Sequence, residues 1–303
     1  MNILVSANDN YIRPLKIMLY SLFEKEKTGI KIYFLYSDVS RENMRTLDIL
    51  IRQNGGKFIP VCVENGIFDD APVWGYFTKE IYYRVLCSEL LPQSLERVLY
   101  LDSDILIRNS IQELYEMDFC GKMLIGIPDQ LSVNKKKIRG KKEMLGLTEK
   151  DIYINSGVIL FNLDKMRKEF VLKDFLTDVE KHKDILVCPD QDEINRYFRG
   201  DIGVTGWTYN YPAYWSFFIR HRIHFAVRNP SIVHYMGNLK PWDIRYIGRY
   251  FFEYYHYFRK FQSRREKWVI LLKPFFSIAE LIKNIWGRVF DKRELSGKVR
   301  EDS

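Results

Sequence analysis

The feature that most constrains this chain is a short apolar run that ends in two carboxylates. Residues 98–101 are continuously apolar, which predicts a strand buried on both faces. Asp102 and Asp104 follow at once, spaced by one residue. Ligands of open α/β sheets bind beyond the carboxyl ends of such strands, and two hard oxygen donors can share a divalent cation that holds a diphosphate. A surface turn is the alternative, because Asp and Ser favour turns.

Strands and helices alternate along the chain, which predicts a doubly wound, mostly parallel α/β sheet. A helix after Tyr11 places Leu15, Met18, Leu19 and Leu22 on one face. Ser40 is the expected N-cap of an amphipathic helix. The further expected strands are residues 3–5, 30–36, 58–63, 124–127 and 153–162. The expected helices include residues 40–53, 79–91 and 110–116, and another helix begins within residues 188–192.

The positive charge is concentrated near the end of the sequence. The 303 residues carry a formal net charge of +8 and suffice for one large α/β domain with an appendage. Residues 1–242 hold 33 Lys and Arg against 31 Asp and Glu, whereas residues 243–303 hold 14 against 8. This asymmetry indicates an anionic partner, namely a membrane, a nucleic acid or an acidic glycan, with a merely solvated tail as the alternative.

The cysteines and the start of the chain bear on its environment. Cys62, Cys87, Cys120 and Cys188 lie far apart, so we expect buried thiols in a reducing compartment and no disulfide framework. Met1 leads directly into a predicted strand, so we expect neither a signal peptide nor an N-terminal anchor.

Several polar segments allow two interpretations. Residues 6–11 lie at a strand-to-helix turn, where Asn and Asp cap helices or face a nucleotide on whose base Tyr11 could stack. The basic residues 135–142 form a loop or a fraying helix that is solvated or faces an anionic surface. Gly157 permits either a bulge or a close backbone approach to a ligand. A lone histidine such as His234 is either structural or a ligand.

Five of these segments, in this order, resemble the retaining glycosyltransferase family eight, which includes the bacterial lipopolysaccharide galactosyl- and glucosyltransferases and glycogenin. The matching segments are residues 7–11, 83–84, 99–104, 155–158 and 234–242. The resemblance covers about four-fifths of the chain. It implies an α/β fold of the GT-A type, a Rossmann-like, mostly parallel sheet in residues 1–242. The composition of residues 243–303, which lie beyond the resemblance, predicts a small, helical, basic and aromatic appendage.

The resemblance also implies roles for individual residues. It makes Asp102, Asp104 and His234 the ligands of Mn²⁺, with Mg²⁺ as the alternative metal. The implied binding residues for the UDP-sugar are Ala7, Asn8, Asn10, Tyr11, Arg84, Asp102, Ser103, Asp104, Asp129, Asn155, Gly237 and Lys240. Gln191, Asp190 and Lys240 are the implied catalytic residues: Gln191 near the anomeric carbon, Asp190 on sugar hydroxyls and Lys240 on the diphosphate.

One position departs from the family pattern, which commonly has Asp where this chain has Asn8. An amide oxygen can still accept a hydrogen bond from a uracil edge, so UDP binding is retained. The implied activity is transfer of galactose or glucose from UDP-galactose or UDP-glucose, with retention of configuration, to an oligosaccharide or glycolipid acceptor. Lipopolysaccharide core, a lipid-linked oligosaccharide and a capsule precursor all fit as acceptor, and no residue distinguishes the two donor sugars.

The end of the sequence predicts membrane attachment. Residues 268–290 are interrupted by Lys273, Glu280, Lys283 and Arg288, too many charges for a transmembrane span. As a helix after Pro274 they form an amphipathic, basic and aromatic segment of the kind that lies in the membrane plane. We expect it to hold the enzyme on the cytoplasmic face of the bacterial cell membrane, with packing on the core or on a second subunit as the alternative.

Two other classes of function compete. A nucleic-acid-binding protein would account for the charge and the aromatic residues, but it leaves the carboxylate pair unexplained. A catalytically weak sugar-nucleotide-binding protein would retain the fold, but all three implied metal ligands are present. We therefore expect an enzyme without a nucleic-acid partner.

Overall fold

The computed structural model describes residues 1–27, 29–64, 66–69, 71–73, 78–213, 227–243, 246 and 248–261. The described residues belong to two compact units, one that ends with residue 235 and includes residues 1–212, and one that includes residue 213 and the described residues of 236–261. The predicted domain boundary after Trp242 stays a prediction.

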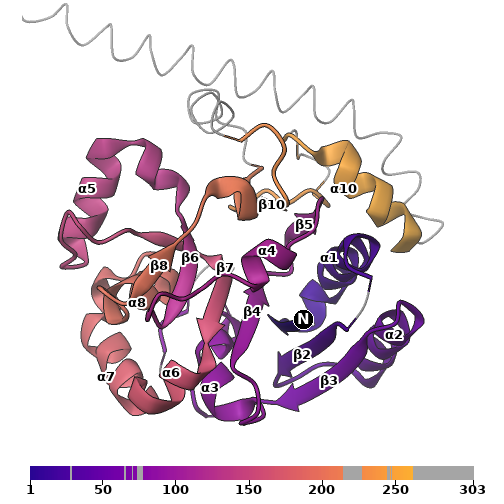
Figure 1. The fold of residues 1–303 in the computed structure, drawn as a ribbon, viewed down its shortest axis with the longest axis horizontal. Helices are drawn as coiled ribbons and strands as arrows, with labels where there is room; N and C mark the ends of the chain where they lie inside the picture. Colours follow the sequence, from indigo (N-terminus) through magenta and orange to yellow (C-terminus); the bar gives the residue numbers. More distant parts are fainter. Residues whose placement is uncertain are drawn as a thin grey trace, which may run out of the picture. The chain divides into compact units, whose positions relative to one another are not determined.

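A seven-stranded sheet forms the centre of the first unit (Figure 1). Its strands are β1 (Asn2–Ser6), β2 (Lys31–Tyr36), β3 (Lys57–Cys62), β4 (Arg97–Leu101), β6 (Leu124–Pro128), β7 (Ile154–Asn162) and β8 (Ile202–Val204). Their order is β3-β2-β1-β4-β7-β6-β8, and β7 alone runs antiparallel to its neighbours β4 and β6. Since the chain leaves β1 toward β2 and β3 and returns to β4 on its other side, the switch point of the sheet lies beside the carboxyl end of β1.

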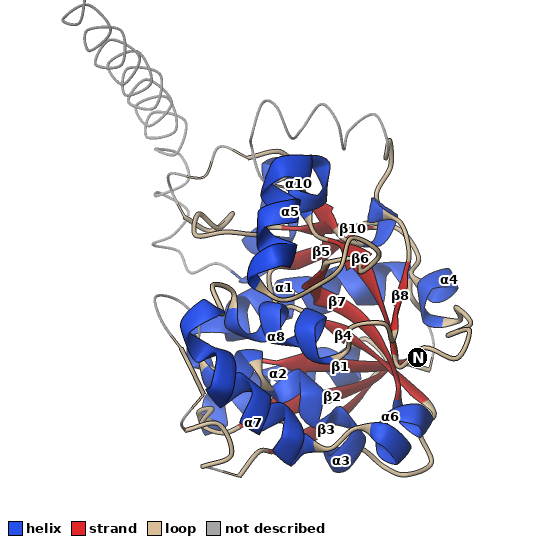
Figure 2. Cartoon of the chain, turned by 90° about the vertical axis from the view of Figure 1, so that its left-hand side faces the viewer, coloured by secondary structure: helices blue, strands red, loops and turns tan. Residues whose placement is uncertain are grey.

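Helices flank the sheet in both ribbon views (Figures 1 and 2). The α-helices are α1 (Ile12–Lys25), α2 (Arg41–Gln53), α3 (Cys87–Leu90), α4 (Gln112–Tyr115), α5 (Lys135–Met144), α6 (Leu163–Glu169), α7 (Leu172–His182), α8 (Pro189–Tyr197) and, in the second unit, α10 (Phe251–Phe258). The 3₁₀ helices are η1 (Asp9–Tyr11), η2 (Lys79–Ile81), η3 (Tyr83–Leu86), η4 (Gln130–Val133), η5 (Lys183–Ile185), η6 (Trp207–Tyr209) and η7 (Arg259–Phe261).

Three local predictions are confirmed. Strand β4 is buried as its apolar run predicts, with residues 98–101 all at most 2% exposed. Helix α1 buries the predicted face. The Ser40 hydroxyl caps α2 by accepting a hydrogen bond from the backbone N–H of Asn43.

The predicted helix over residues 79–91 is wrong, because this stretch consists of η2, η3 and α3. The carbonyl of Ile81 accepts a hydrogen bond from Nε of Arg84 at 2.8 Å. Val85 N–H donates to Tyr82 O, which is the tighter 3₁₀ pattern. The side chain of Arg84 thus competes for a carbonyl that an α-helix needs.

The basic residues 135–142 belong to a regular helix, α5, rather than to a loop. Asn134 caps its first turn by accepting from Lys137 N–H at 3.1 Å, and Arg139 pairs with Glu143 one turn later.

A second, three-stranded sheet completes the first unit. It consists of β5 (Ile105–Ile107), β10 (Ile232–His234) and β9 (Tyr211–Pro212), in that order. Strand β10 runs antiparallel to β5 and places His234 opposite Ile105. A residue from late in the sequence is thereby brought beside the segment that follows β4.

The cysteines are all free thiols, but Cys87 alone is fully buried. The predicted burial is wrong for Cys62 and Cys120, which are exposed. Cys62 ends the edge strand β3, and Cys120 lies in a turn with a positive φ of 48°.

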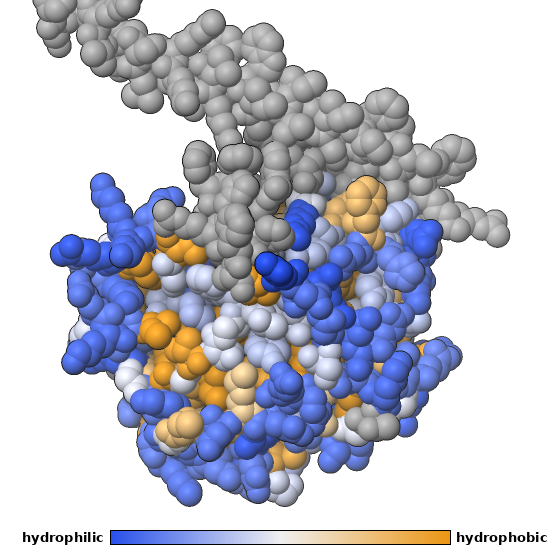
Figure 3. Space-filling view, turned by 45° about the horizontal axis from the view of Figure 1, so that its top comes forward, coloured by the Kyte–Doolittle hydropathy of each residue, from blue (hydrophilic) through white to orange (hydrophobic). Residues whose placement is uncertain are grey.

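Hydrophilic side chains dominate the face of the described residues shown in Figure 3, with the apolar areas divided among them. Among the helices whose residues the structure describes, none combines the length and the apolar composition that crossing a membrane requires. The predicted tail helix of residues 274–290 lies outside the described residues.

Candidate active site

The carboxyl ends of β1 and β4 and the beginning of β7 meet at one edge of the large sheet. Because β7 is antiparallel to β4, its first residues lie opposite the end of β4, with Val158 paired to Leu101. The next residue, Asp102, extends this pairing by donating its backbone N–H to Gly157 O at 2.9 Å. The Ser103 hydroxyl donates to the carbonyl of Ser6 at the end of β1, at 3.4 Å.

Asp102, Asp104 and His234 form a cluster at this edge, which we call the metal cluster after the ion that the sequence predicts for it. Each offers a ligand atom, and these atoms lie within 4.8 Å of one another. Nε2 of His234 is 3.2 Å from Oδ1 of Asp104 and 3.7 Å from Oδ2 of Asp102. His234 and Asp104 are buried, whereas the side chain of Asp102 is 23% exposed, so the cluster is open on the side of Asp102.

The donor set of this cluster fits a divalent cation. Two carboxylates supply hard oxygens and one imidazole supplies a nitrogen, a combination that suits Mn²⁺ and accommodates Mg²⁺ less well. A backbone hydrogen bond also joins the segments that carry two of these ligands. Tyr235 N–H, which follows His234, donates to Asp104 O at 3.0 Å. The three residues predicted to share a metal are therefore brought together.

Arg84 occupies a buried position between two carboxylates. Its Nη2 is 3.2 Å from Oδ1 of Asp102 and 3.3 Å from Oδ2 of Asp190. The guanidinium also lies over the ring of Tyr100, 4.1 Å from its centroid. Burial lowers the pKa of Arg84, but Tyr100, Asp102 and Asp190 outweigh it, so the net pKa is raised and the cation persists.

A network of buried amides and carboxylates lies at the start of β7. Oε1 of Gln191 accepts from Nδ2 of Asn155 at 2.7 Å and from the backbone N–H of Ser156 at 3.2 Å. Nε2 of Gln191 donates to Tyr153 Oη at 2.9 Å and to Asp129 Oδ2 at 3.3 Å. The predicted sugar-binding residues Asn155, Asp129 and Gln191 are thus in direct contact, and the amide of Gln191 is held in one orientation.

Asp190, one residue before Gln191, joins this network to the metal cluster. Its Oδ2 accepts from the Ser156 hydroxyl at 2.9 Å and pairs with Arg84. Burial raises the pKa of Asp190, while the charge of Arg84 lowers it. Burial likewise raises the pKa of Asp129, against hydrogen bonds from Leu131 N–H, Asn155 and Gln191.

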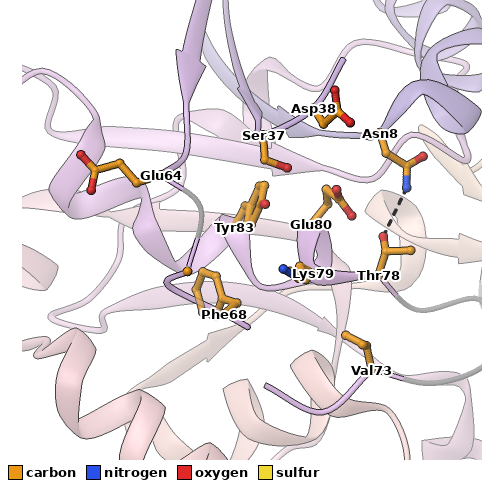
Figure 4. Close-up of a pocket in the computed structure, with 11 residues that line it drawn as sticks. Asn8, Ser37, Asp38, Glu64, Phe68, Val73, Thr78, Lys79, Glu80 and Tyr83 are labelled. Carbon is orange, nitrogen blue, oxygen red and sulfur yellow. Dashed lines mark hydrogen bonds between the residues drawn. The ribbon is translucent and has the colours of Figure 1, made fainter. Parts of the chain in front are cut away.

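A cavity of about 440 Å³ lies on the other side of the cluster, beyond the carboxyl ends of β1, β2 and β3. Figure 4 shows its lining, in which Asn8 donates from Nδ2 to Thr78 Oγ1 at 3.4 Å. Its lining residues are Asn8, Ser37, Asp38, Glu64, Gly66, Phe68, Val73, Thr78, Lys79, Glu80 and Tyr83.

Only Asn8 of the predicted nucleotide-binding residues lines this cavity. Asn8 is at once the N-cap of η1, because its Oδ1 accepts from Asn10 N–H at 3.2 Å. Asn8 therefore caps a helix and lines the cavity at the same time, so the two interpretations of this residue do not exclude each other. Asn10 and Tyr11 lie in η1, and Ala7 is buried just before it.

Hydrogen bonds connect the cavity wall to the metal cluster through β1. The Ser6 hydroxyl donates to Glu80 O at 3.0 Å and lies 3.3 Å from the Tyr100 hydroxyl. Tyr100 in turn donates to Oδ1 of Asp102 at 2.7 Å. The sequence alone assigns no role to the side chains of Ser6, Tyr100, Tyr153 and Ser156, because their hydrogen-bond partners lie far away in the sequence.

Gly237 and Lys240 belong to the second unit. Gly237 has a φ of 86°, a left-handed conformation that favours glycine, and Lys240 O accepts from Asp243 N–H at 2.9 Å. Their predicted roles on the diphosphate stay predictions.

Gly157 permits a close approach, but to the metal cluster itself. A Cβ atom at this position would lie 2.6 Å from Oδ2 of Asp102 and 2.9 Å from Nδ1 of His234. We expect Gly157→Ala to displace both side chains and to weaken Mn²⁺ binding about 10- to 100-fold, as loss of support around a metal typically does. Isothermal titration with Mn²⁺ measures this effect.

Gly126→Ala is a matched control on the neighbouring strand, where the three atoms nearest to an added Cβ all belong to the side chain of Ile154. It should lower the melting temperature without lowering Mn²⁺ affinity. Equal Mn²⁺ affinity of Gly157→Ala and wild type would contradict the placement of the cluster.

Helix α8 also carries a buried acid outside the site. The side chain of Glu193 is fully buried, and neither of its oxygens accepts a hydrogen bond. Burial and the neighbouring carboxylate of Asp178 raise the pKa of Glu193 to about 9, from a model-compound value of 4.5. The folded protein therefore keeps a proton that the unfolded chain loses between these two pH values, and stability falls as the pH rises through this window.

We expect Glu193→Gln to remove this dependence. Its melting temperature should match that of wild type near pH 4.5 and exceed it by several degrees at pH 9, measured by calorimetry. Glu180→Gln, on the exposed face of α7, should show no such difference. A Glu193→Gln protein less stable than wild type at pH 9 would show that the acid is ionised when folded.

Comparison with known proteins places this chain in a family. A model of glycosyl transferase family 8 matches residues 2–245, so the chain belongs to this family and is a glycosyltransferase. General stress protein A of Bacillus subtilis is 25% identical over 270 residues, which are 85% of this chain and 92% of that protein. The lipopolysaccharide 1,2-glucosyltransferase of Escherichia coli K12 is 21% identical over 250 residues, 80% of this chain and 72% of that protein.

Solved structures confirm the GT-A fold. The galactosyltransferase LgtC, crystallised with donor and acceptor sugar analogs, superposes with a TM-score of 0.77 at 24% identity, over 88% of this chain and 99% of that one. The glycosyltransferase GlyE of Streptococcus pneumoniae superposes with a TM-score of 0.65 at 21% identity, over 92% of this chain and 64% of that one.

Proposed function

We propose that this glycosyltransferase is a metal-dependent, retaining hexosyltransferase that transfers galactose or glucose from a UDP-sugar. The observation that carries the proposal is the order of three features along one sheet edge. The cavity at β1–β3, the Asp102–Asp104–His234 cluster after β4, and the buried amide network at β6 and β7 follow the strand order. A nucleoside, a diphosphate and a sugar have the same order in a nucleotide sugar.

The chain's own residues have distinct tasks in this proposal. A bound divalent cation would stabilise the charge that develops on the leaving diphosphate. Arg84 pairs with both Asp102 and Asp190 and holds them side by side, so that one faces the cation and the other can accept hydrogen bonds from sugar hydroxyls. Asn155 and Tyr153 fix the amide of Gln191, which we place near the anomeric carbon. The configuration is then retained because the acceptor attacks the anomeric carbon on the same face from which the leaving group departs.

Lys240 completes the diphosphate site in the proposal. The segment of residues 237–242, with its left-handed Gly237, would fold over the donor as a lid. A cation brought by the lid favours the transition state over the bound substrate, because negative charge on UDP grows during bond cleavage.

The acceptor we propose is an oligosaccharide or glycolipid of a bacterial surface polysaccharide. The named lipopolysaccharide glucosyltransferase of Escherichia coli and 1,3-galactosyltransferase of Salmonella typhimurium support this class. Galactose and glucose stay open as the transferred sugar.

Thermal stabilisation discriminates this proposal from nucleic-acid binding. The cavity carries three carboxylates, and its one lysine pairs with Asp69, so it suits a neutral base better than a polyanion. We expect UDP together with Mn²⁺ to raise the melting temperature, and a single-stranded oligonucleotide to leave it unchanged. Stabilisation by the oligonucleotide and not by UDP with Mn²⁺ would refute the proposal.

We also propose attachment to the cytoplasmic face of the cell membrane through the basic tail. Residues 259–300 carry 12 Lys and Arg against 4 Asp and Glu, and each basic residue near an anionic surface adds about 1 kcal/mol. A chain ended after residue 258 should lose most of its binding to anionic vesicles in sedimentation, and neutral vesicles should bind neither form. Equal sedimentation of both forms with anionic vesicles would refute membrane attachment.

A further inference from the structure

His234 makes two different contacts with the two nitrogens of its ring. Nε2 faces the carboxylates of the metal cluster, whereas Nδ1 lies 2.9 Å from Oδ1 of Asn210. Asn210 is 1% exposed and directly precedes β9, which pairs with the strand of His234. None of the roles described so far uses its side chain.

A backbone donor fixes which end of the Asn210 amide faces the histidine. Gly157 N–H, which can only donate, is 3.1 Å from the side-chain oxygen of Asn155. Nδ2 of Asn210 donates to this same oxygen at 2.8 Å. The other end of the Asn210 amide is therefore its oxygen, and an amide oxygen can only accept. The proton between Asn210 and His234 must belong to Nδ1 of His234.

A second backbone donor fixes this series of hydrogen bonds from its other end. Oε1 of Gln191 accepts from Ser156 N–H at 3.2 Å and from Nδ2 of Asn155 at 2.7 Å. The orientation of Asn155 is thus set independently at both ends of its amide. All of these side chains are buried, so water does not compete for their hydrogen bonds.

We propose that Asn210 is a positioning residue that holds His234 in the Nδ1–H tautomer, with the lone pair of Nε2 directed at the cation site. A ligating histidine needs such a partner on its other nitrogen to fix the tautomer and the ring orientation. The inference rests on the proposed function for the identity of the cation, but not for the tautomer.

The metal-free protein tests the tautomer directly. Long-range ¹H–¹⁵N correlation spectra of uniformly ¹⁵N-labelled protein distinguish the two neutral tautomers, and the signal of His234 is identified by its loss in His234→Gln. We expect a proton on Nδ1, where the acceptor oxygen of Asn210 lies. A neutral ring with its proton on Nε2 and none on Nδ1 overturns the proposal, whether or not the protein binds Mn²⁺.

Two variants then separate positioning from mere packing. Asn210→Asp keeps an acceptor for Nδ1–H but loses the donor to Asn155, whereas Asn210→Leu loses both. We expect Asn210→Leu to populate both tautomers of His234 and to weaken Mn²⁺ binding about 10- to 100-fold, in titration with Mn²⁺ alone. We expect Asn210→Asp to keep the tautomer and the Mn²⁺ affinity near those of wild type, even where its melting temperature falls. Equal weakening by the two variants, or none by Asn210→Leu, overturns the proposal. Failure of wild type to bind Mn²⁺, with the Nδ1–H tautomer observed, refutes the metal-dependent function and leaves the role of Asn210 supported.

Discussion

Asp102→Ala and Asp104→Ala should each remove almost all sugar transfer. Removing one of two carboxylate ligands costs several kcal/mol of charge stabilisation, so kcat/KM should fall on the order of a hundredfold or more. The measurement is release of UDP from a UDP-sugar at saturating Mn²⁺. Asp104→Ala is the sharper variant, because Asp104 contacts His234 whereas Asp102 also pairs with Arg84.

The fold should survive the loss of Asp104. Its side chain is held in the cluster with another carboxylate nearby, and its removal relieves their repulsion in the absence of metal. Asp48→Ala, which breaks a surface pair with Arg52 on α2, is the matched control and should keep full activity. Undiminished transfer by either cluster variant in excess EDTA would contradict a metal-dependent reaction.

Arg84→Met should have the largest effect on stability. It leaves Asp102 and Asp190 without their shared cation, and removing one partner of a buried ion pair costs about 3–5 kcal/mol. At about 2–4 °C per kcal/mol for a domain of this size, the melting temperature should drop by roughly ten degrees. Calorimetry at pH 8 measures the drop.

The pH dependence of this loss identifies its cause. Without Arg84, the pKa of Asp190 rises further, so the folded variant binds a proton at a higher pH than the unfolded chain does. Stability of the variant then increases as the pH falls, and the gap to wild type should be smaller at pH 5 than at pH 8. Arg139→Met, at an exposed pair on α5, should change little at either pH. A gap that does not vary with pH would mean that Arg84 acts by packing alone.

The sequence predicts the large sheet well because its strands are locally distinctive. An apolar run such as residues 98–101 buries both of its faces as a central strand of the sheet. The two carboxylates that follow this strand then lie at the edge of the sheet. Ser40 and the apolar face of α1 are equally local signals.

Tertiary contacts decide the features that the sequence does not predict. The helix expected over residues 79–91 breaks where Arg84 turns inward and takes the carbonyl of Ile81. His234 reaches the carboxylates through the pairing of β10 with β5, and β5 has only three residues. Asn210 has no local signal, since its importance arises only from partners far away in the sequence.

Metal-dependent hydrolysis of a panel of UDP-sugars is the most direct test of the central claim that the Asp102–Asp104–His234 cluster serves a UDP-hexose. Wild-type protein is incubated with UDP-galactose, UDP-glucose and their N-acetylated counterparts, with Mn²⁺ or with EDTA, and Asp104→Ala is run in parallel. We predict UDP release from one of the two simple hexose donors, with Mn²⁺ only, and none from Asp104→Ala. Hydrolysis that persists in EDTA or in Asp104→Ala, or no release from UDP-galactose and UDP-glucose alike, would contradict this account.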